Sequence, residues 1–203
     1  MFTGIVTTTA PIVAIEERDQ LRTLVVALED RERENLEIGA SVANNGVCLT
    51  VTKLEDNKVF FDVMEETLRL TNLEFVEVGS RVNIERSLVF GKEVGGHVVS
   101  GHVHTRATLT ELTKTDTNCR MRLTLDPRWM KYILHKGFVA VNGCSLTVGE
   151  VFEDGFALYL IPETLSITNL GEAVVGTVFN IEIDSQTQTI VDTVERVLAA
   201  RGQ

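Results

Sequence analysis

The chain has little cysteine, little proline and no long apolar run, and each shortage excludes a class of protein. Its 203 residues include three cysteines, an odd number without CxxC spacing, which opposes both a disulfide framework and a zinc site. With three prolines and no low-complexity tract, long disordered segments are not expected. No segment approaches the roughly 18 apolar residues of a membrane span, so we expect no membrane association.

Basic residues are also scarce. There are 19 Lys and Arg against 29 Asp and Glu, a net charge of −10, and the acids are spread along the chain. This distribution opposes binding to the phosphate backbone of nucleic acids. The amino terminus lacks the basic start and continuous apolar core of a signal peptide, so we predict a cytoplasmic protein.

The chain is, by contrast, rich in internal similarity. Residues 42–73 reappear as residues 139–170 at a fixed offset of 97 without a gap, and 13 of the 32 aligned positions are identical. The identities cluster in two blocks, NG..LTV and ETL..TNL. Two small domains with two related pockets are therefore predicted. The same offset aligns TGIV at 3–6 with SGHV at 100–103 and VNIE at 82–85 with FNIE at 179–182.

Both copies contain short, apolar-rich or alternating segments bounded by turn residues, which are typical of β-strands. About six short strands per copy favour a small closed or nearly closed antiparallel barrel. Asn-Gly at 45–46 and at 142–143 predicts two hairpin turns. Helical signals predict one short helix per copy, at 30–36 and 127–133. The predicted strands are 24–28, 41–43, 49–53, 59–63, 81–85, 120–125, 138–141, 146–151, 156–161 and 178–183.

The tail after residue 183 belongs to neither copy. Ser185 and Gln188 resemble a capping box, and the apolar residues 190, 191, 194, 197 and 198 then share one helical face. A lone helix of about four turns is marginal, so this face needs either its own barrel or a neighbouring subunit. A glycine-rich stretch at 88–97 joins the copies. The predicted units are residues 1–92, 93–184 and 185–203.

Five motifs in order together resemble riboflavin synthase, and the resemblance covers the whole chain. It implies an all-β fold of two tandem six-stranded Greek-key β-barrels related by duplication, plus a C-terminal α-helix that joins three subunits. Each barrel would bind one 6,7-dimethyl-8-ribityllumazine. The motifs are MFTGIV at 1–6, NGVCLTVT at 45–52, GGHVVSGHV at 95–103, NGCSLTV at 142–148 and NIEID at 180–184.

The resemblance also implies a reaction. Two lumazines dismutate: one donates a four-carbon unit to the other, giving riboflavin and 5-amino-6-ribitylaminouracil without a metal or coenzyme. The site would lie between the N-terminal barrel of one subunit and the C-terminal barrel of another in a homotrimer, and association with a lumazine synthase stays open. The alternative is a non-catalytic lumazine- or flavin-binding carrier of the same fold. Such relatives look degraded in the second copy, which is intact here.

Small polar side chains follow each Asn-Gly turn. Cys48 and Thr50, like Ser145 and Thr147, bracket a leucine and are positioned to face a pteridine ring. Taken alone, these threonines reflect β-propensity and Cys48 a small buried apolar residue. The resemblance implies ligand contact instead, with Cys48 as a transient nucleophile or polar contact.

Two mismatches between the copies introduce charge or a titratable ring. His102 stands against Ile5, and Lys136 against Gly39. His102 is either structural or a proton shuttle, and Lys136 is either a surface residue or, as the resemblance implies, a neighbour of the C-terminal ligand. His104 shares a strand face with His102, but no Cys or carboxylate stands at a recognised ligand spacing, so no metal site is expected.

A third mismatch sets Asp184 against Ser87. Asp184 is either a favourable acid before a helix N-terminus or, with Ser41 of a neighbouring subunit, an activator of the attacking species. The repeated ETL segments are either helix starts or, as the resemblance implies, segments at 62–67 and 160–165 that close over the ligand. The chain departs from the family at Asn142, where an aspartate is common.

The resemblance thus implies catalytic roles for Ser41, Cys48, His102, Ser145, Thr147 and Asp184. The implied substrate contacts of the first copy and the linker are Gly4, Ile5, Val6, Cys48, Leu49, Thr50, Asp62, Val63, Met64, Glu65, Glu66, Thr67, Gly101, His102 and Val103. Those of the second copy are Lys136, Ser145, Leu146, Thr147, Leu160, Ile161, Pro162, Glu163, Thr164 and Leu165.

Overall fold

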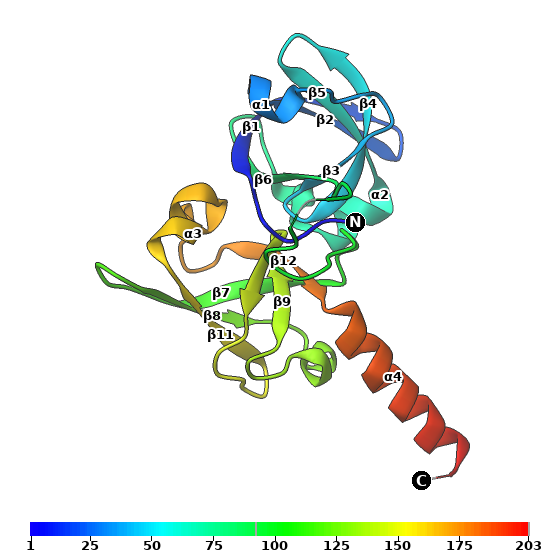
Figure 1. Cartoon of the computed structure of the whole chain (residues 1–203), viewed down its shortest axis with the longest axis vertical. Helices are drawn as coiled ribbons and strands as arrows, with labels where there is room; N and C mark the ends of the chain where they lie inside the picture. Colours follow the sequence, from blue (N-terminus) through cyan, green and yellow to red (C-terminus); the bar gives the residue numbers. More distant parts are fainter. Residues whose placement is uncertain (92, 203) are drawn as a thin grey trace.

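The computed structural model describes residues 1–91 and 93–202, which form two six-stranded antiparallel sheets and a helical tail (Figure 1). The predicted end of the first unit at Lys92 lies outside the described residues. The first sheet contains β1 (Thr8–Arg18), β2 (Leu21–Ala27), β3 (Ser41–Asn44), β4 (Val47–Glu55), β5 (Lys58–Met64) and β6 (Arg81–Arg86). The second contains β7 (Thr105–Lys114), β8 (Cys119–Thr124), β9 (Phe138–Val141), β10 (Cys144–Thr147), β11 (Gly155–Leu160) and β12 (Val178–Ile183).

The two sheets share one topology, which confirms the predicted all-β duplicated fold. The first closes in the order β1-β2-β5-β4-β3-β6, and the second repeats this order as β10-β9-β12-β7-β8-β11 without a ladder between β10 and β11. There the edges meet through bonds from Gly149 N to Ala157 O and from Ala157 N to Glu150 O, each 2.8 Å. The second barrel is therefore nearly closed.

Local sequence signals explain most of these elements. Asn45-Gly46 and Asn142-Gly143 are two-residue hairpin turns with positive φ at both residues, as predicted. The strands β1 and β7 were absent from the sequence prediction. In β7 threonine and charged residues interrupt the apolar pattern, and β1 is apolar only from Ala10 to Ile15 and ends in three charged residues.

The helical content is higher than the one short helix per copy that the sequence predicts. Both predicted helices form, as α1 (Asp30–Arg33) and the 3₁₀ helix η2 (Pro127–Tyr132). Each ETL segment also begins a helix. These additional helices are α2 (Glu65–Leu70) and α3 (Pro162–Ile167), each followed by a 3₁₀ turn, η1 (Asn72–Phe75) or η3 (Asn169–Glu172).

The repeats exchange their N-terminal segments. Val6, which precedes the first barrel, is 7 % exposed and belongs to the core of the second barrel. Val103, its equivalent before the second barrel, packs against the core of the first. The N-terminus accordingly lies between the two barrels in Figure 1. Each core is thus completed by the opposite repeat.

Six asparagines hold the two barrels together around a pseudo-twofold axis. Asn72 donates from Nδ2 to Asn142 Oδ1 at 3.0 Å, and its equivalent Asn169 donates to Asn45 Oδ1 at 2.9 Å. The backbone N–H groups of the same two residues donate to the Oδ1 atoms of a third pair, at 2.6 and 2.8 Å. That third pair is Asn180 and Asn83. Asn142 is thus part of the inter-barrel contact as well as a turn residue.

The tail forms α4 (Ser185–Ala200), and its cap differs from the predicted capping box. Asp184 is the N-cap: its Oδ2 accepts the Thr187 N–H at 2.7 Å. Gln188 instead contacts His104 Nε2 through its Oε1 at 3.1 Å. The helix begins one residue after the acid because a carboxylate satisfies the free N–H groups of the first turn.

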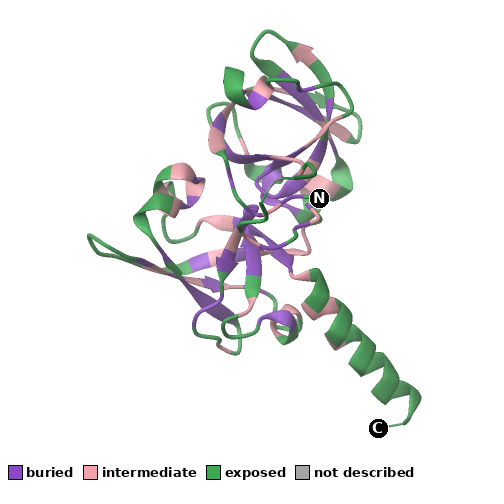
Figure 2. Ribbon diagram, in the orientation of Figure 1, coloured by how far each residue is buried: buried purple, intermediate pink, exposed green. Residues whose placement is uncertain are grey.

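Most of α4 lies away from both barrels (Figure 2). Val191 packs against the second core, whereas the remaining apolar face is exposed, with Ile190 at 64 %. Val194, Val197 and Leu198 complete that face. No helix among residues 1–91 and 93–202 has the length and hydropathy needed to cross a membrane.

Candidate functional site

The exchanged segments place one strand-like stretch of each repeat against the other barrel's candidate site. Cys48 N donates to Gly101 O at 2.9 Å, and at the equivalent place Ser145 N donates to Gly4 O at 2.8 Å. His102 therefore follows a residue bonded to the first barrel, and Ile5 one bonded to the second. Alignment of the two repeats alone would instead place Ile5 with the first barrel and His102 with the second.

Glycine is required at both contacts. Gly4 has φ +74° and Gly101 has φ +84°, a region that side chains rarely adopt. A Cβ atom would lie 2.5 Å from the Cβ of Ser145 at Gly4 and 2.5 Å from the Cβ of Cys48 at Gly101. The backbone thus lies directly against the candidate polar residues.

The first-barrel site is built on β3, β4 and the segment 101–103. Ser41 pairs with Thr50 across the β3–β4 ladder. Thr50 is exposed and Cys48 is partly exposed, whereas Leu49 between them is buried in the core. This alternation turns both polar side chains to the same outer face of the strand. His102, the residue after Gly101, is exposed.

The second-barrel site repeats this alternation and adds a histidine. Ser145 is partly exposed, Leu146 is buried and Thr147 is exposed. His97 Nδ1 lies 2.6 Å from Ser145 Oγ, and the His97 ring stacks on Phe138 with centroids 5.1 Å apart. Burial lowers the pKa of His97, and the nearby Asp184 carboxylate opposes that shift.

His97 was not among the candidates selected from the sequence. It is 8 % exposed and directly contacts a candidate hydroxyl. A signal was present: His97 lies in the segment GGHVVSGHV at 95–103, which also carries His102. His104, in contrast, is held by Ile183 N and Gln188 and serves the barrel-to-helix junction.

The segments at 62–67 and 160–165 run from a strand end into α2 and α3. Asp62 Oδ1 accepts the Thr23 hydroxyl at 2.7 Å, and Glu66 pairs with Arg69 on the surface. Met64 and Ile161 are exposed, at 63 % and 61 %, directly before the helices. Of the remaining members, Val63 and Leu160 are buried in the cores, Thr67, Thr164 and Leu165 are half-buried, and Glu65, Pro162 and Glu163 are exposed.

Lys136 has a left-handed backbone conformation, and its counterpart in the first copy, Gly39, has the same conformation. Lys136 has φ +64° and donates its N–H to Val148 O, and Gly39 has φ +90° and donates to Val51 O. The side chain of Lys136 is exposed. The strained conformation is thus retained while a positive charge is added on the second-barrel side only.

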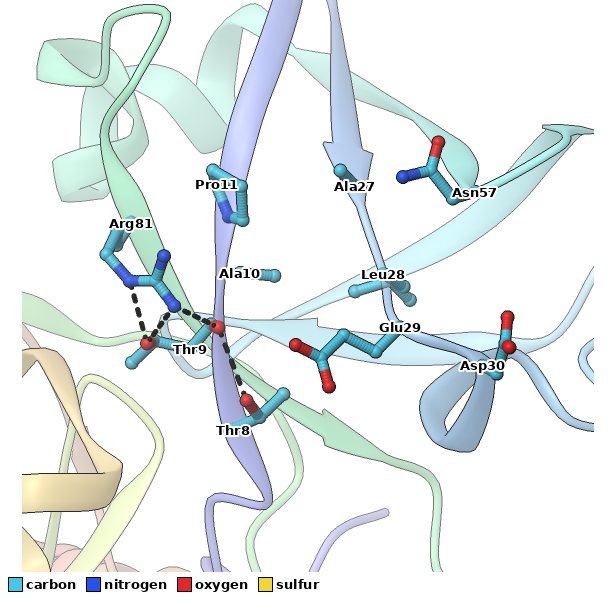
Figure 3. A pocket seen from close by; sticks show the side chains of 10 residues that line it. All are labelled: Thr8, Thr9, Ala10, Pro11, Ala27, Leu28, Glu29, Asp30, Asn57 and Arg81. Atoms are coloured by element: carbon cyan, nitrogen blue, oxygen red, sulfur yellow. Dashed lines mark hydrogen bonds between the residues drawn. The ribbon is translucent and has the colours of Figure 1, made fainter.

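Two further features of the described residues concern possible metal ligands and a surface cavity. Among residues 1–91 and 93–202 no three His, Cys, Asp or Glu side chains are grouped so as to hold a metal ion. A cavity of about 480 Å³ lies on the first barrel between β1 and the β2–α1 connection, where Arg81 donates to Thr9 (Figure 3). None of its lining residues is a candidate site residue.

Comparison with known proteins agrees with this duplicated architecture. The lumazine binding domain family matches residues 3–87 and 100–184. Riboflavin synthase of Escherichia coli (strain K12) is 53 % identical over 99 % of this chain and 95 % of its own length. Riboflavin synthase of Chlamydia pneumoniae is 38 % identical over the full length of both chains.

Solved structures show the same fold. LumP complexed with riboflavin superposes with a TM-score of 0.84 at 27 % identity, covering 91 % of this chain and all of that one. LumP complexed with 6,7-dimethyl-8-(1'-D-ribityl) lumazine superposes with a TM-score of 0.83. From the duplicated match and the full-length similarity to curated enzymes, the chain belongs to the riboflavin synthase family.

Proposed function

We propose that this protein is a riboflavin synthase, which converts two molecules of 6,7-dimethyl-8-ribityllumazine into riboflavin and 5-amino-6-(D-ribitylamino)uracil. The observation that carries the proposal is the pair of equivalent sites, built by one repeated backbone and equipped with different polar side chains. The same backbone explains how two identical molecules are bound. The different side chains explain how one becomes the donor and the other the acceptor of the four-carbon unit.

Positioning supplies most of the rate in this proposal. Two lumazines held against each other have a high effective concentration, which offsets about 7 kcal/mol or more of the barrier. The polar side chains then move protons and contact the rings. His102 takes the proton of the donor's methyl group or returns one to the leaving amine, and Cys48 or a hydroxyl contacts the electrophilic ring carbon.

The complete site requires more than one subunit in this proposal. The exposed apolar face of α4 supplies the contact that holds a homotrimer, and the first barrel of one subunit then faces the second barrel of another. Across that interface Ser41 and Asp184 of different subunits activate the attacking species together. Because Asp184 already caps α4, formation of the helix also fixes the position of this carboxylate. We place the protein in the cytoplasm.

The direct test is to mix the purified protein with 6,7-dimethyl-8-ribityllumazine and follow riboflavin by absorbance. Turnover well above the uncatalysed rate is expected, with one riboflavin formed for two lumazines consumed. No turnover above that rate would refute the proposed activity.

The observation that favours a second candidate is the superposition on LumP structures that contain riboflavin or a lumazine. A carrier would bind a single ligand and release it unchanged. Titration with riboflavin, combined with light scattering, separates the candidates, because the synthase is expected to be trimeric with two kinds of site per chain. One ligand on a monomer, without turnover, would favour the carrier.

The role of α4 is tested by ending the chain after Asp184. The truncated protein should lose the trimer mass and most of its turnover, because the second barrel then no longer meets its partner. A point variant, Val194→Asp, provides a milder comparison on the same exposed face. Unchanged mass and rate in both variants would contradict this assignment.

A further inference from the structure

Glu85 is a buried carboxylate that none of the reaction steps above uses. It lies at the end of β6 and is 6 % exposed. Its Oε1 accepts the Thr3 N–H at 2.6 Å and the Thr3 hydroxyl at 2.7 Å, and its Oε2 accepts the Gly4 N–H at 3.1 Å. The Thr3 hydroxyl in turn accepts the Ile5 N–H at 3.2 Å. One carboxylate therefore orients three consecutive peptide groups.

Glu182 repeats this arrangement in the second barrel. It is 5 % exposed, and its Oε1 accepts the Ser100 N–H at 2.7 Å and the Ser100 hydroxyl at 2.8 Å. Its Oε2 accepts the Gly101 N–H at 3.0 Å, and the Ser100 hydroxyl accepts the His102 N–H at 3.1 Å. The same hydrogen-bond geometry thus occurs at two equivalent places in one chain, which indicates that it is a feature of the repeat.

Each carboxylate binds a segment that lies against the other barrel's site. Glu85 belongs to the first barrel, but the Gly4 that it holds accepts the Ser145 N–H of the second. Glu182 belongs to the second barrel, but its Gly101 accepts the Cys48 N–H of the first. The connections between carboxylate and site are therefore crossed.

We propose that Glu85 and Glu182 are crossed positioning residues: Glu182 of the second barrel sets the ligand site at Cys48, and Glu85 of the first barrel sets the ligand site at Ser145. The inference rests on the proposed function only in taking these two places as ligand sites. Neither carboxylate touches a ligand; each acts through the segment it holds.

The chemistry supports ionised carboxylates in these positions. All three partners of each group are donors, so an ionised carboxylate satisfies every one of them, and hydrogen bonds to a charged acceptor are stronger than neutral ones. Burial raises the pKa of both carboxyls, and the three donors oppose that shift. A glutamine would turn an NH₂ group toward N–H and O–H donors, so it should release the segment while keeping nearly the same volume.

The experiment uses a thiol as a reporter of one site. Cys48 is partly exposed and the other two cysteines are buried, so alkylation of the native chain reports on Cys48. The alkylation rate is measured across a titration with riboflavin, whose protection of the thiol gives the affinity of that site. A second background, Cys48→Ser with Ser145→Cys, moves the reporter to the other site.

Crossed effects are expected. Glu182→Gln should weaken protection of Cys48 about tenfold, and Glu85→Gln should change it less than twofold; in the exchanged background the two effects should trade places. The exposed control Glu153→Gln should change neither reporter. If either glutamine variant fails to fold, Ser100→Ala and Thr3→Val remove only the hydroxyl bonds and should give the same crossed pattern with smaller effects.

The opposite patterns would overturn the proposal. Equal effects of both variants on one reporter would show that the carboxylates act through general stability, and a larger effect of each on its own barrel would show that the connection is not crossed. Protection of the thiol by riboflavin requires that riboflavin binds, but it does not require turnover. Failure of the wild-type protein to form riboflavin would therefore count against the proposed function alone.

Discussion

The asparagine contact between the barrels predicts a large effect of a single substitution far from any candidate catalytic group. Asn72 is 8 % exposed. Its side chain donates to Asn142 Oδ1 and to Val178 O, both at 3.0 Å, and accepts from Asn45 Nδ2 at 3.3 Å. Asn72→Ala removes all three bonds, two of which cross between the barrels.

The magnitude follows from what the alanine leaves behind. Each lost hydrogen bond removes about 1 kcal/mol of net stability. Asn142 Oδ1 keeps a second donor in Asn180 N, but the NH₂ group of Asn45 loses the acceptor that Asn72 provided in the buried contact. A buried unsatisfied donor adds roughly 1–3 kcal/mol, so the free energy of unfolding should fall by about 4–6 kcal/mol.

The assay is urea unfolding at a fixed protomer concentration, because association with other subunits would shift the apparent stability. Trp129 is the only tryptophan and packs against the second core, so its fluorescence reports that barrel, while far-UV circular dichroism reports both. In the wild type the two signals should change together. In Asn72→Ala they should separate as the barrels uncouple.

Two controls make the result decisive. Asn169→Ala removes the pseudo-symmetric contact and should have a comparable effect. Asn118→Ala, in an exposed turn, should change the free energy of unfolding by less than about 0.5 kcal/mol. A loss at Asn72 no greater than that at Asn118, with coincident transitions, would refute the reasoning.

Three further outcomes are expected. The pKa of His97 is lowered in the folded chain, so the unfolded chain binds a proton first as the pH falls through about 6.5. The stability of the wild type should therefore drop between pH 7.5 and 5.5 more than that of His97→Gln. Parallel profiles of melting temperature against pH would contradict this. Asp184→Ala should lower the free energy of unfolding by about 1 kcal/mol and reduce the helical signal in circular dichroism, whereas Asp184→Asn should keep the cap. Equal spectra for both variants would exclude the capping role. Burial raises the pKa of Cys144 to about 12, so intact-mass analysis after alkylation at pH 8 should find one modified thiol, Cys48, and modification of Cys144 in the native chain would show that the core opens.

Local chemistry made much of the fold predictable from sequence. The Asn-Gly turns, the strands that follow them and the apolar face of α4 each depend on a few neighbouring residues. The strand β7 escaped prediction because a threonine-rich strand with one exposed face carries a weak apolar pattern, whereas the apolar segment of β1 from Ala10 to Ile15 was missed. The N-cap was displaced by one residue because Ser185 and Asp184 are both good caps, and only the bond to Thr187 distinguishes them.

The candidate sites were less predictable because their parts come from both repeats. Alignment of the repeats pairs Ile5 with His102 correctly, but alignment carries no information on which barrel each segment joins. That choice depends on long-range bonds such as Cys48 N to Gly101 O. His97 illustrates the same limit, because the importance of this residue rests on a contact with Ser145, 48 positions away.

The exchange changes how the asymmetry between the two substrates must be understood. Along the sequence, the mismatches Cys48 against Ser145 and Ile5 against His102 look as though each copy contributes one unusual residue. In space, Cys48 lies against the segment that carries His102, through the bond from Cys48 N to Gly101 O. Ser145 meets the segment that carries Ile5, and the ring of His97 beside it is buried with a lowered pKa. The exposed His102 therefore belongs to the segment that meets the first barrel, and the exchange of one short segment distinguishes two candidate sites that are built on the same backbone.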